Sequence, residues 1–294
     1  MNTFTFDSIP IPVSRGRAGF TRIDRGVHIP TGSPLSGVLW ARCIWTKSPS
    51  VIFGGFVGLT YHYIHFWQDT LPIVGHVLGS KSFNRKLYLQ WGRFSGQSIA
   101  GLDPCFRDLR VASLPDCVID CLIQLKKHQV EWDVPPIPGL EPWQVRAVQV
   151  IDAARRHRQL TWAELKQAAK HRFCAKQLLA LSTSSSDLCD SPRETLLRLL
   201  ISDLAANPEL QHPIFRNPGD EFPFTIIDLA WKDHKVAVYY DGEHHLDRRQ
   251  RNRDAEIRNH LEELGWVVVA VTAPELRNPE RLRRRVKRAI DRGR

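Results

Sequence analysis

The sequence lacks the cysteine patterns of a zinc site. None of its cysteines forms a Cys-x-x-Cys pair or the cysteine and histidine spacing of a zinc ribbon or finger. Cys117 and Cys121 are four residues apart in a predicted helix, where we expect buried free thiols. Structural zinc is therefore not expected, and free thiols favour a reducing compartment. The six cysteines are Cys43, Cys105, Cys117, Cys121, Cys174 and Cys189.

Long hydrophobic runs are also missing. The first residues, MNTFTFDSIP, have no basic start followed by an apolar run, so they do not fit a signal peptide. The most apolar stretch, VIFGGFVGLTYHYI at 51–64, is too short to span a bilayer. We therefore expect a soluble, cytoplasmic protein with no membrane partner.

Acidic residues are fewer than basic ones. With 41 Lys and Arg against 31 Asp and Glu, the formal net charge is +10. Such a surface favours a polyanionic partner, because each basic residue that pairs with a phosphate releases condensed counterions. The balance points weakly to nucleic acid, since many basic proteins simply have basic surfaces. The 294 residues, 43% of them hydrophobic, are enough for one large globular domain or two ordinary ones.

A polar segment, STSSSDLCDS at 182–191, marks the clearest domain boundary, because it has no hydrophobic periodicity. Before it, we predict a mixed α/β domain over 1–181, with short apolar runs between Pro and Gly breaks. Its stretch 141–171 predicts two helices, the second with a capping box of Thr161 and Glu164. These helices could form a DNA-binding helix-turn-helix, or could simply pack on a core.

After the boundary, residues 191–294 predict a second α/β domain in the order helix, strand, strand, helix, strand, helix. The first helix has Ser191 as N-cap and Pro192 in its first turn. In the second helix, Ile257, Leu261 and Leu264 are expected on one side, before a stop at Gly265. The predicted elements are a helix at 191–204, strands at 222–231 and 235–240, a helix at 248–266, a strand at 266–272 and a helix at 278–290. The last helix is expected to have Asn278 as its N-cap and Leu282, Val286 and Ile290 facing inward.

Two acids follow or interrupt the paired strands of this domain. By strand alternation, Asp228 shares a face with Phe224 and Ile226, opposite Ile227, Leu229 and Trp231. A hairpin could bring Asp241, in the stretch VAVYYDGEHH, close to Asp228. Two converging carboxylates suit a magnesium ion. The alternative, about equally supported by the spacing, is a simple Asp241-Gly242 turn and a hydrogen-bonded strand acid.

Other polar residues near these strands carry a similar ambiguity. Glu194 fits a capping box with Ser191, but it could also lie beside a metal. His245 could donate a proton, orient water or contact phosphate. The arginines that begin the next helix suit phosphate contacts, or form an ordinary solvated face. These arginines are Arg248, Arg249, Arg251 and Arg253.

The order of these motifs resembles a known group of nucleases. The SPRET helix, the strand with Asp228, the strand ending YYDGEHH, the Arg-rich helix and the strand VVVAVT look like the endonuclease-like domains related to Vsr, the very-short-patch repair nucleases of the PD-(D/E)XK superfamily. The resemblance covers about 190–292. It implies a restriction-endonuclease-like αββαβα core and magnesium-dependent hydrolysis of a DNA phosphodiester bond. It also implies Asp228 as principal metal ligand, Asp241 as second acid, Glu194 as the helix acid, and His245 as the histidine after the DG turn.

One position departs from that pattern. Related domains usually carry Glu where this chain has Tyr239, and a tyrosine supplies no anionic oxygen at neutral pH. Vsr-type nucleases also lack this glutamate and are similar in using a backbone carbonyl, which here would be that of Tyr240. The resemblance therefore allows an active Vsr-like site or a degenerate nuclease that binds DNA without cutting it.

The first domain has a resemblance of its own. Its stretches IDRGVHIP, SVIFGGFVGLTYHYI and SLPDCVIDCLIQL, within about 20–175, look like the AbiEi-type antitoxin-like region that often precedes this nuclease-like domain. We expect the N-terminal winged helix of that region to be shortened or absent here. This resemblance keeps open an alternative function, a non-catalytic DNA-binding regulator of antitoxin type.

Overall fold

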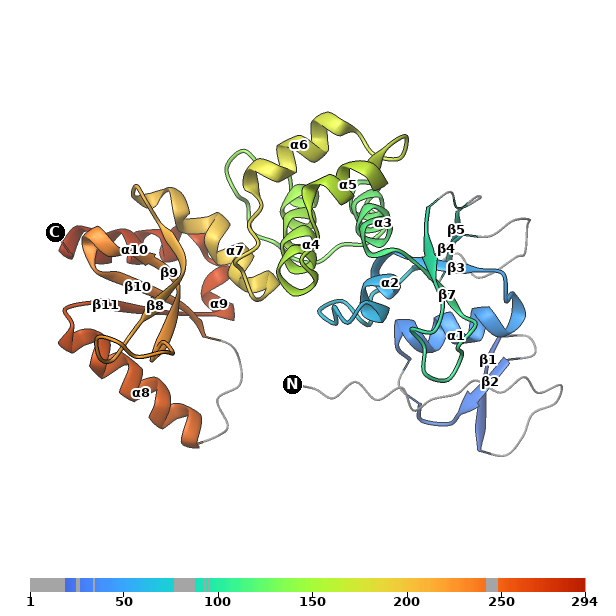
Figure 1. The fold of residues 1–294 in the computed structure, drawn as a ribbon, viewed down its shortest axis with the longest axis horizontal. Helices are drawn as coiled ribbons and strands as arrows, with labels where there is room; N and C mark the ends of the chain where they lie inside the picture. Colours follow the sequence, from blue (N-terminus) through green and yellow to red (C-terminus); the bar gives the residue numbers. More distant parts are fainter. Residues whose placement is uncertain are drawn as a thin grey trace. The chain divides into compact units, whose positions relative to one another are not determined.

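The computed structural model describes residues 19–24, 27–33, 35–76, 88–91, 94, 96–241 and 248–293, with backbone only at 23–24, 88–91 and 248–251. The chain is mixed α/β, as predicted, and divides into two compact units (Figure 1). Unit 1 comprises Met1–Glu131 and Leu160–Ala180, and unit 2 comprises Trp132–Gln159 and Leu181–Arg294. The units are interleaved in sequence, because a segment before residue 160 belongs with the C-terminal part of the chain.

Unit 1 contains a two-stranded sheet and a five-stranded sheet in the order β5-β4-β3-β7-β6. Cys117 and Cys121, on α3, are free and fully buried, which confirms their predicted role as small hydrophobic groups. Its strands are β1 (Phe20–Asp24), β2 (Val27–Pro30), β3 (Ile52–Gly54), β4 (Ile73–His76), β5 (Tyr88–Trp91), β6 (Ser98–Ile99) and β7 (Arg110–Ala112). Its helices are α1 (Gly37–Lys47), α2 (Gly55–Tyr61), α3 (Leu114–Lys126), α5 (Trp162–Ala169) and the first part of α6 (Ala175–Ser184).

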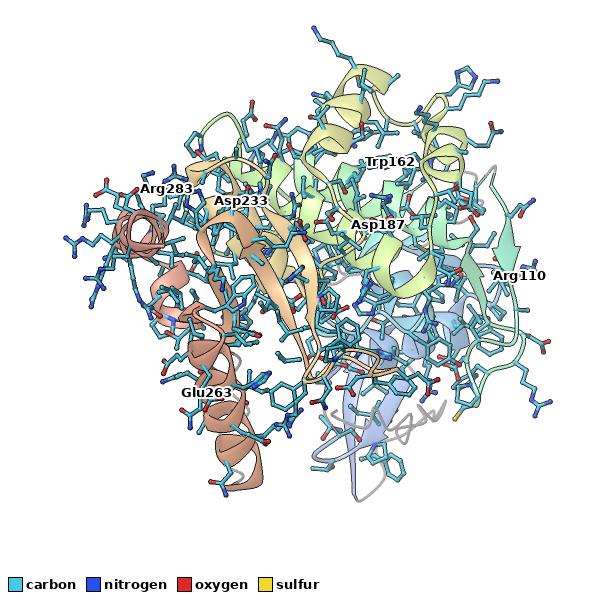
Figure 2. The ribbon with its side chains drawn as sticks, turned by 60° about the vertical axis from the view of Figure 1, so that its left-hand side comes forward. Arg110, Trp162, Asp187, Asp233, Glu263 and Arg283 are labelled. Carbon is cyan, nitrogen blue, oxygen red and sulfur yellow. The ribbon has the colours of Figure 1, made fainter. Side chains whose placement is uncertain are left out.

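Unit 2 is built on a four-stranded sheet in the order β11-β10-β9-β8. The β10 and β11 strands are parallel, and the other neighbours are antiparallel. Asp233 marks the short turn that joins β9 to β10 (Figure 2). The strands are β8 (Glu209–Ile214), β9 (Thr225–Trp231), β10 (Val236–Asp241) and β11 (Val267–Thr272). The helices are α4 (Pro142–Arg158), α7 (Pro192–Ile201), η1 (Ser202–Leu204), η2 (Lys232–His234), α8 (Arg248–Glu263), α9 (Ala273–Leu276) and α10 (Pro279–Arg292).

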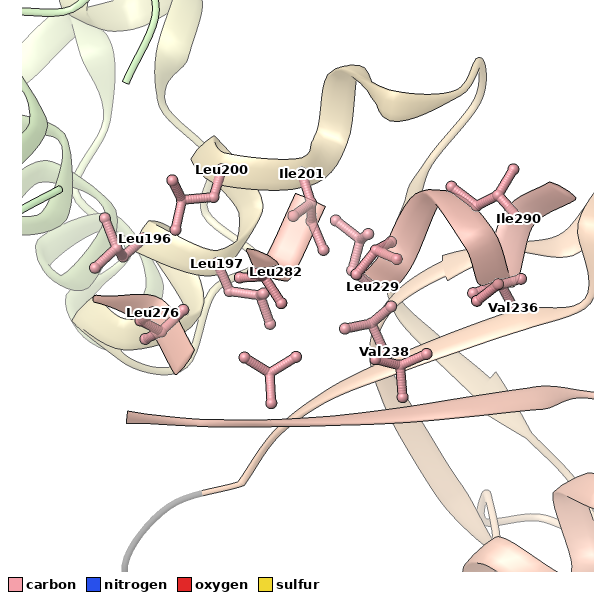
Figure 3. Packing of buried hydrophobic residues seen from close by; sticks show 14 of the residues in the cluster. Leu196, Leu197, Leu200, Ile201, Leu229, Val236, Val238, Leu276, Leu282 and Ile290 are labelled. Atoms are coloured by element: carbon pink, nitrogen blue, oxygen red, sulfur yellow. The ribbon is translucent and has the colours of Figure 1, made fainter. Parts of the chain in front are cut away.

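The sheet of unit 2 has a hydrophobic cluster on each face. Figure 1 shows α8 on one side of the sheet and α7 and α10 on the other. On the α7 and α10 side, an apolar stripe on α7 packs against Leu229, Val236 and Val238 (Figure 3). The stripe consists of Leu196, Leu197, Leu200 and Ile201. On the α8 side, Leu261 packs against Ile227 and Ala237. The strands are thus covered on both faces, which explains their nearly continuous hydrophobic sequences.

The helix ends follow the predicted capping signals. The Ser191 hydroxyl accepts a 3.2 Å hydrogen bond from the Glu194 N–H, and Pro192 is the first residue of α7. The Asn278 side chain caps α10 in the same way, by accepting from the Arg281 N–H at 3.2 Å. These caps satisfy N–H groups that have no partner within the helix.

Three details differ from the sequence-based expectations. The edge strand β8 was not predicted, so the unit has three antiparallel strands before α8 rather than two. The α4 helix packs in unit 2, whereas α5 lies in unit 1. Leu264 was expected on the buried side of the α8 helix, but it follows the end of that helix and is 41% exposed. Gly265 does adopt the left-handed conformation expected at a helix stop, with φ +80°.

Among the described residues, no helix combines the length and the apolarity that crossing a bilayer requires.

Candidate active site

The candidate site lies where β9 and β10 stop pairing. The two strands pair through Val238 and Leu229, and the next side chain along β9 is Asp228. Its Oδ2 atom accepts a 2.6 Å hydrogen bond from the backbone N–H of Tyr240. The carboxylate therefore takes a bond that the strand ladder would otherwise use, and the two strands separate at this point.

The strand on the other side of β9, β8, is irregular opposite Asp228. Leu210 pairs with Leu229 and His212 pairs with Ile227, so Gln211 lies across from Asp228. Gln211 has a positive φ of +51°, which is uncommon for a residue with a side chain. At this same level, the predicted alternation along β9 was wrong.

The correction concerns the hydrophobic residues around the acid. Ile227 packs in the cluster on the α8 side, whereas Leu229 packs in the cluster on the α7 side. Phe224 precedes β9 instead of belonging to it. Asp228 thus lies at the point where the side-chain alternation of β9 is interrupted, between Ile227 on one face of the sheet and Leu229 on the other.

Glu194 approaches this point from the first turn of α7. Its carboxylate accepts from the Asp190 N–H at 2.8 Å and from the Ser191 hydroxyl at 2.9 Å. The Gln211 amide lies 3.5 Å from the same carboxylate. Glu194 thus bonds to the Asp190 N–H and not to the Ser191 N–H, so the predicted capping box is not formed, although Ser191 does cap the helix. Glu194 also lies on the side of the helix that faces β8.

The electrostatics of Asp228 depend on this arrangement. Burial is the largest cause that raises its pKa, and the negative charge of Glu194 is the second. The Tyr240 N–H lowers the pKa and the Asp190 charge raises it, and the result is a pKa of about 7. Among the described residues, no basic group stabilises the ionised form of Asp228.

Glu194 is affected in the same direction. Burial is the largest cause that raises its pKa, while the hydrogen bonds from Asp190 and Ser191 lower it. Asp190 and Arg156 also act on it, with opposite signs. Both acids are therefore partly buried, and the Glu194 charge disfavours the ionisation of Asp228.

A buried network fixes the position of α7. The Asp152 carboxylate, on α4, accepts from the Arg198 guanidinium at 2.9 Å and from the Thr195 hydroxyl at 3.1 Å. It also accepts from the Ser185 hydroxyl and from the Ser186 N–H. Because Thr195 and Arg198 belong to α7, this network holds the helix that carries Glu194.

The remaining predicted residues of β10 have different surroundings. Asp241 is the last residue of the strand, pairs with Thr272 of β11 and is partly exposed. The Tyr239 hydroxyl lies 3.3 Å from that of Thr225, and burial raises the pKa of Tyr239 to about 12. Tyr239 is therefore neutral at physiological pH and provides no anionic ligand. A side-chain pairing of Asp228 with Asp241 stays a prediction.

The carboxylates that lie where β9 and β10 stop pairing are chemically suited to a hard cation. Asp228 and Glu194 offer carboxylate oxygens. Burial raises the pKa of both, and repulsion by Glu194 raises that of Asp228 further. A divalent cation would remove this repulsion. No group of three or more His, Cys, Asp or Glu side chains arranged to hold a metal occurs in the described part of the chain. His245 lies outside that part.

The predicted phosphate-binding arginines are only partly described. Arg248, Arg249 and Arg251 lie in the first turn of α8, and their side chains are outside the described residues. Arg253 donates a 2.7 Å hydrogen bond to the Phe224 carbonyl and stacks 4.3 Å from the centre of that ring. Arg253 thus fastens the segment before β9 to α8, and its predicted DNA contact stays a prediction.

Two residues near Asp228 were not found from the sequence. Asp190 comes from the segment before α7, and Gln211 comes from the unpredicted strand β8. Both are joined to Glu194 by hydrogen bonds, and the Asp190 charge also raises the pKa of Asp228 directly. Neither belongs to a spaced motif with Asp228, so no signal in the sequence connects them.

No model of a known protein family matches the chain. Two curated relatives from Mycobacterium tuberculosis are each 30% identical to it over 158 residues. They are Uncharacterized protein MT2308 of strain CDC 1551 / Oshkosh and Uncharacterized protein Rv2248 of strain H37Rv. The aligned part is 51% of this chain and 56% of each relative, so the chain spans about half the length of the curated relatives it matches.

Proposed function

We propose that unit 2 is a magnesium-dependent endonuclease that hydrolyses phosphodiester bonds in DNA, with a Vsr-like fold of the PD-(D/E)XK type. The observation that carries the proposal is the pair formed by Asp228 and Glu194. Burial and the Glu194 charge raise the pKa of Asp228 to about 7, and no basic group among the described residues offsets this. Repelling carboxylates at a strand opening are a suitable site for a divalent cation.

The proposed ligands come from three elements. Asp228 and Glu194 would supply carboxylate oxygens, and Tyr240 would supply its backbone carbonyl. In an extended strand, the N–H and C=O of one residue point toward the same neighbour. Since the Tyr240 N–H points toward Asp228, its carbonyl also faces β9. Asp241 and His245 stay in the proposal as a second acid and a proton-transfer group.

The chemistry proposed for this site is the activation of water beside a phosphate. Bound magnesium would lower the pKa of a coordinated water and offset negative charge on the phosphate. The ionised carboxylate of Asp228 would hold the cation, and the Tyr240 N–H would fix the direction of that carboxylate. Asp152 would act as a positioning residue, because its bonds to Thr195 and Arg198 keep α7 in place.

A plasmid-nicking assay tests this proposal. Supercoiled DNA is incubated with the full chain, with and without magnesium, and with the variants Asp228→Asn and Asp233→Asn. Asp233 is an exposed acid in the turn between β9 and β10, so it matches the charge change without touching the site. We expect magnesium-dependent nicking that Asp228→Asn abolishes and Asp233→Asn preserves. Cutting in EDTA, or cutting by Asp228→Asn, would refute the proposal.

A second candidate is the non-catalytic DNA-binding regulator. The observation that favours it is Tyr239, which is neutral where the related domains usually carry an acid. This candidate predicts DNA binding that Asp228→Asn leaves unchanged and no magnesium-dependent cutting. The six free cysteines fit the cytoplasmic location proposed for either function.

A further inference from the structure

A basic groove lies at the free edge of the sheet in unit 2. It has a volume of about 410 Å³ and lies between α10 and the edge strand β11. Val267, Val268 and Val269 form its β11 wall, and no acidic residue lines it. The α10 wall contributes five exposed arginines, namely Arg281, Arg284, Arg285, Arg288 and Arg292. We refer to it as the arginine groove.

The pattern of α10 explains why these arginines gather on one side. Leu282, Val286 and Ile290 are buried against the sheet and fix the orientation of the helix. Arg281, Arg285, Arg288 and Arg292 follow one another at intervals of four, three and four residues, so they form one stripe beside the buried face. With a rise of about 1.5 Å per residue, the stripe is roughly 16 Å long.

Several basic residues of α10 already have acidic partners. Arg283 pairs with Asp203 of η1 at 2.6 Å, and Lys287 pairs with Asp291 at 3.1 Å. The outer side of α10 near the labelled Arg283 carries many nitrogen-tipped side chains (Figure 2). None of these four paired residues lines the groove.

Within the groove, the pairing is incomplete. Arg284 lies 3.6 Å from Glu280, and Arg285 pairs with Glu275 at 2.6 Å. The other three groove arginines have no acidic partner among the residues that the structure describes. These three are Arg281, Arg288 and Arg292.

Protection of the sheet edge accounts for only one of these residues. Arg285 donates a 3.0 Å hydrogen bond to the Ala270 carbonyl of the edge strand, as expected of a residue that guards an edge. This bond also obstructs the addition of a peptide strand along β11. Within the described part of the chain, Arg281, Arg288 and Arg292 donate no such bond to the strand edge, so they need a different explanation.

We propose that the arginine groove binds the phosphate backbone of nucleic acid. Guanidinium groups are planar and donate pairs of hydrogen bonds that fit phosphate oxygens. A linear stripe of them suits a linear series of phosphates better than a single anion, and the covered strand edge disfavours an acidic peptide. The proposal goes beyond the proposed nuclease activity, because it requires no metal and no cleavage.

The groove is separate from the candidate active site within unit 2. Val267, Val268 and Val269 pair with the first half of β10, whereas Tyr240 pairs with Val271 near its end. One strand, β10, also lies between β11 and the strand that carries Asp228. Binding in the groove and binding at the metal site can therefore be tested one at a time.

Fluorescence anisotropy with a short labelled DNA duplex and the full chain, in EDTA, tests the groove. The variant combines Arg281→Gln, Arg288→Gln and Arg292→Gln. The control combines three exposed lysines of unit 1 that have no ion pair among the described residues, changed to Gln. These control positions are Lys126, Lys127 and Lys176, which lie outside the stretch 141–171 that the sequence also allows as a DNA-binding motif.

The salt dependence gives the expected size of the effect. Loss of three phosphate contacts should make the negative slope of log K against log salt less steep by about 3. It should also weaken binding at least about tenfold at salt concentrations between roughly 50 and 200 mM. The lysine control should keep the slope and affinity of the wild type. If the triple variant does not fold, each single arginine variant should lower the slope by about 1.

Three results would overturn the proposal. The first is an unchanged slope in the arginine variants, and the second is an equal loss in the lysine control, which would indicate diffuse charge. The third is displacement of the DNA by poly-glutamate as readily as by unlabelled DNA, which would indicate an acidic-peptide site. Since EDTA is present, failure here leaves the plasmid-nicking test unaffected, and the reverse also holds.

Discussion

The carboxylate of Asp228 accepts a 2.6 Å hydrogen bond from the backbone N–H of Tyr240 on the neighbouring strand. This bond replaces the ladder pairing that ends at Val238 and Leu229. The acid is therefore held in one orientation beside the Tyr240 backbone, while Glu194 approaches from α7. Its ionisation is opposed by burial and by the Glu194 charge. The relationship gives the molecule properties that can be measured without any substrate.

The first prediction concerns Asp228→Asn and pH. Burial and the Glu194 charge raise the folded-state pKa of Asp228 to about 7, above its ordinary value of 3.8. The folded protein therefore binds the proton more tightly than the unfolded chain, and this group lowers stability as pH rises from about 4 to about 7. Asn keeps an oxygen acceptor for the Tyr240 N–H but carries no charge.

In EDTA, Asp228→Asn should thus melt at a higher temperature than the wild type at pH 8 and at nearly the same temperature at pH 4. Each kcal/mol gained corresponds to roughly 2–4 °C in a domain of this size. Differential scanning calorimetry at the two pH values measures the difference. A variant that is less stable at pH 8, or equally stabilised at both values, would contradict the ionisation argument.

The second prediction concerns Glu194→Gln. The amide keeps hydrogen-bonding groups for Asp190 and Ser191 but removes the charge that raises the pKa of Asp228. The loss of stability with rising pH should therefore be smaller and should end at a lower pH than in the wild type, while its onset near pH 4 stays the same. Urea unfolding at a series of pH values from 4 to 8 measures how the free energy of unfolding changes with pH. Glu263→Gln, at the exposed end of α8, is the control and should keep the pH dependence of the wild type.

The third prediction concerns the network that anchors α7. Asp152→Ala would remove the acceptor for Thr195 and leave the Arg198 guanidinium partly buried without its partner. Unpairing such a charge costs about 3–5 kcal/mol. By contrast, Asp187→Ala removes the exposed partner of Arg155 and should cost less than about 1 kcal/mol. Urea denaturation compares the two variants, and similar costs would show that Asp152 does not anchor α7.

The fourth prediction compares two leucines of unit 2. Leu200 is 1% exposed in the cluster between α7 and the sheet, whereas Leu264 is 41% exposed after α8. Leu200→Ala should lower the free energy of unfolding by about 2–5 kcal/mol. Leu264→Ala should change it by less than about 0.5 kcal/mol, as is usual at the surface. Equal effects in chemical denaturation would contradict the layer arrangement.

Local signals in the sequence were sufficient for the helix ends and buried stripes. Ser191 and Asn278 cap their helices as predicted, since the signal and the bond lie within one turn. The inward positions of α10 also follow from a 3.6-residue period, with Leu282, Val286 and Ile290 buried. Such features depend only on neighbours in the chain.

Long-range features could not be predicted in this way. The strand β8 has the sequence ELQHPI, which lacks alternation and includes Pro213, a residue tolerated at a sheet edge. The α4 helix packs in unit 2 through contacts such as Gln149 to the Pro192 carbonyl, 43 residues away. The charges around Asp228 also come from separate segments. For these features, the partner is far away in the chain and leaves no periodic signal.

A magnesium titration followed by thermal melting at pH 8 tests the central claim most directly. The ion should raise the melting temperature of the wild type and of Asp233→Asn, with a gain of about 2.7 kcal/mol when magnesium reaches a hundred times its dissociation constant. Asp228→Asn should show no rise. A wild type that does not respond to magnesium, or an Asp228→Asn variant that responds equally, would contradict the claim that Asp228 and Glu194 hold a divalent cation.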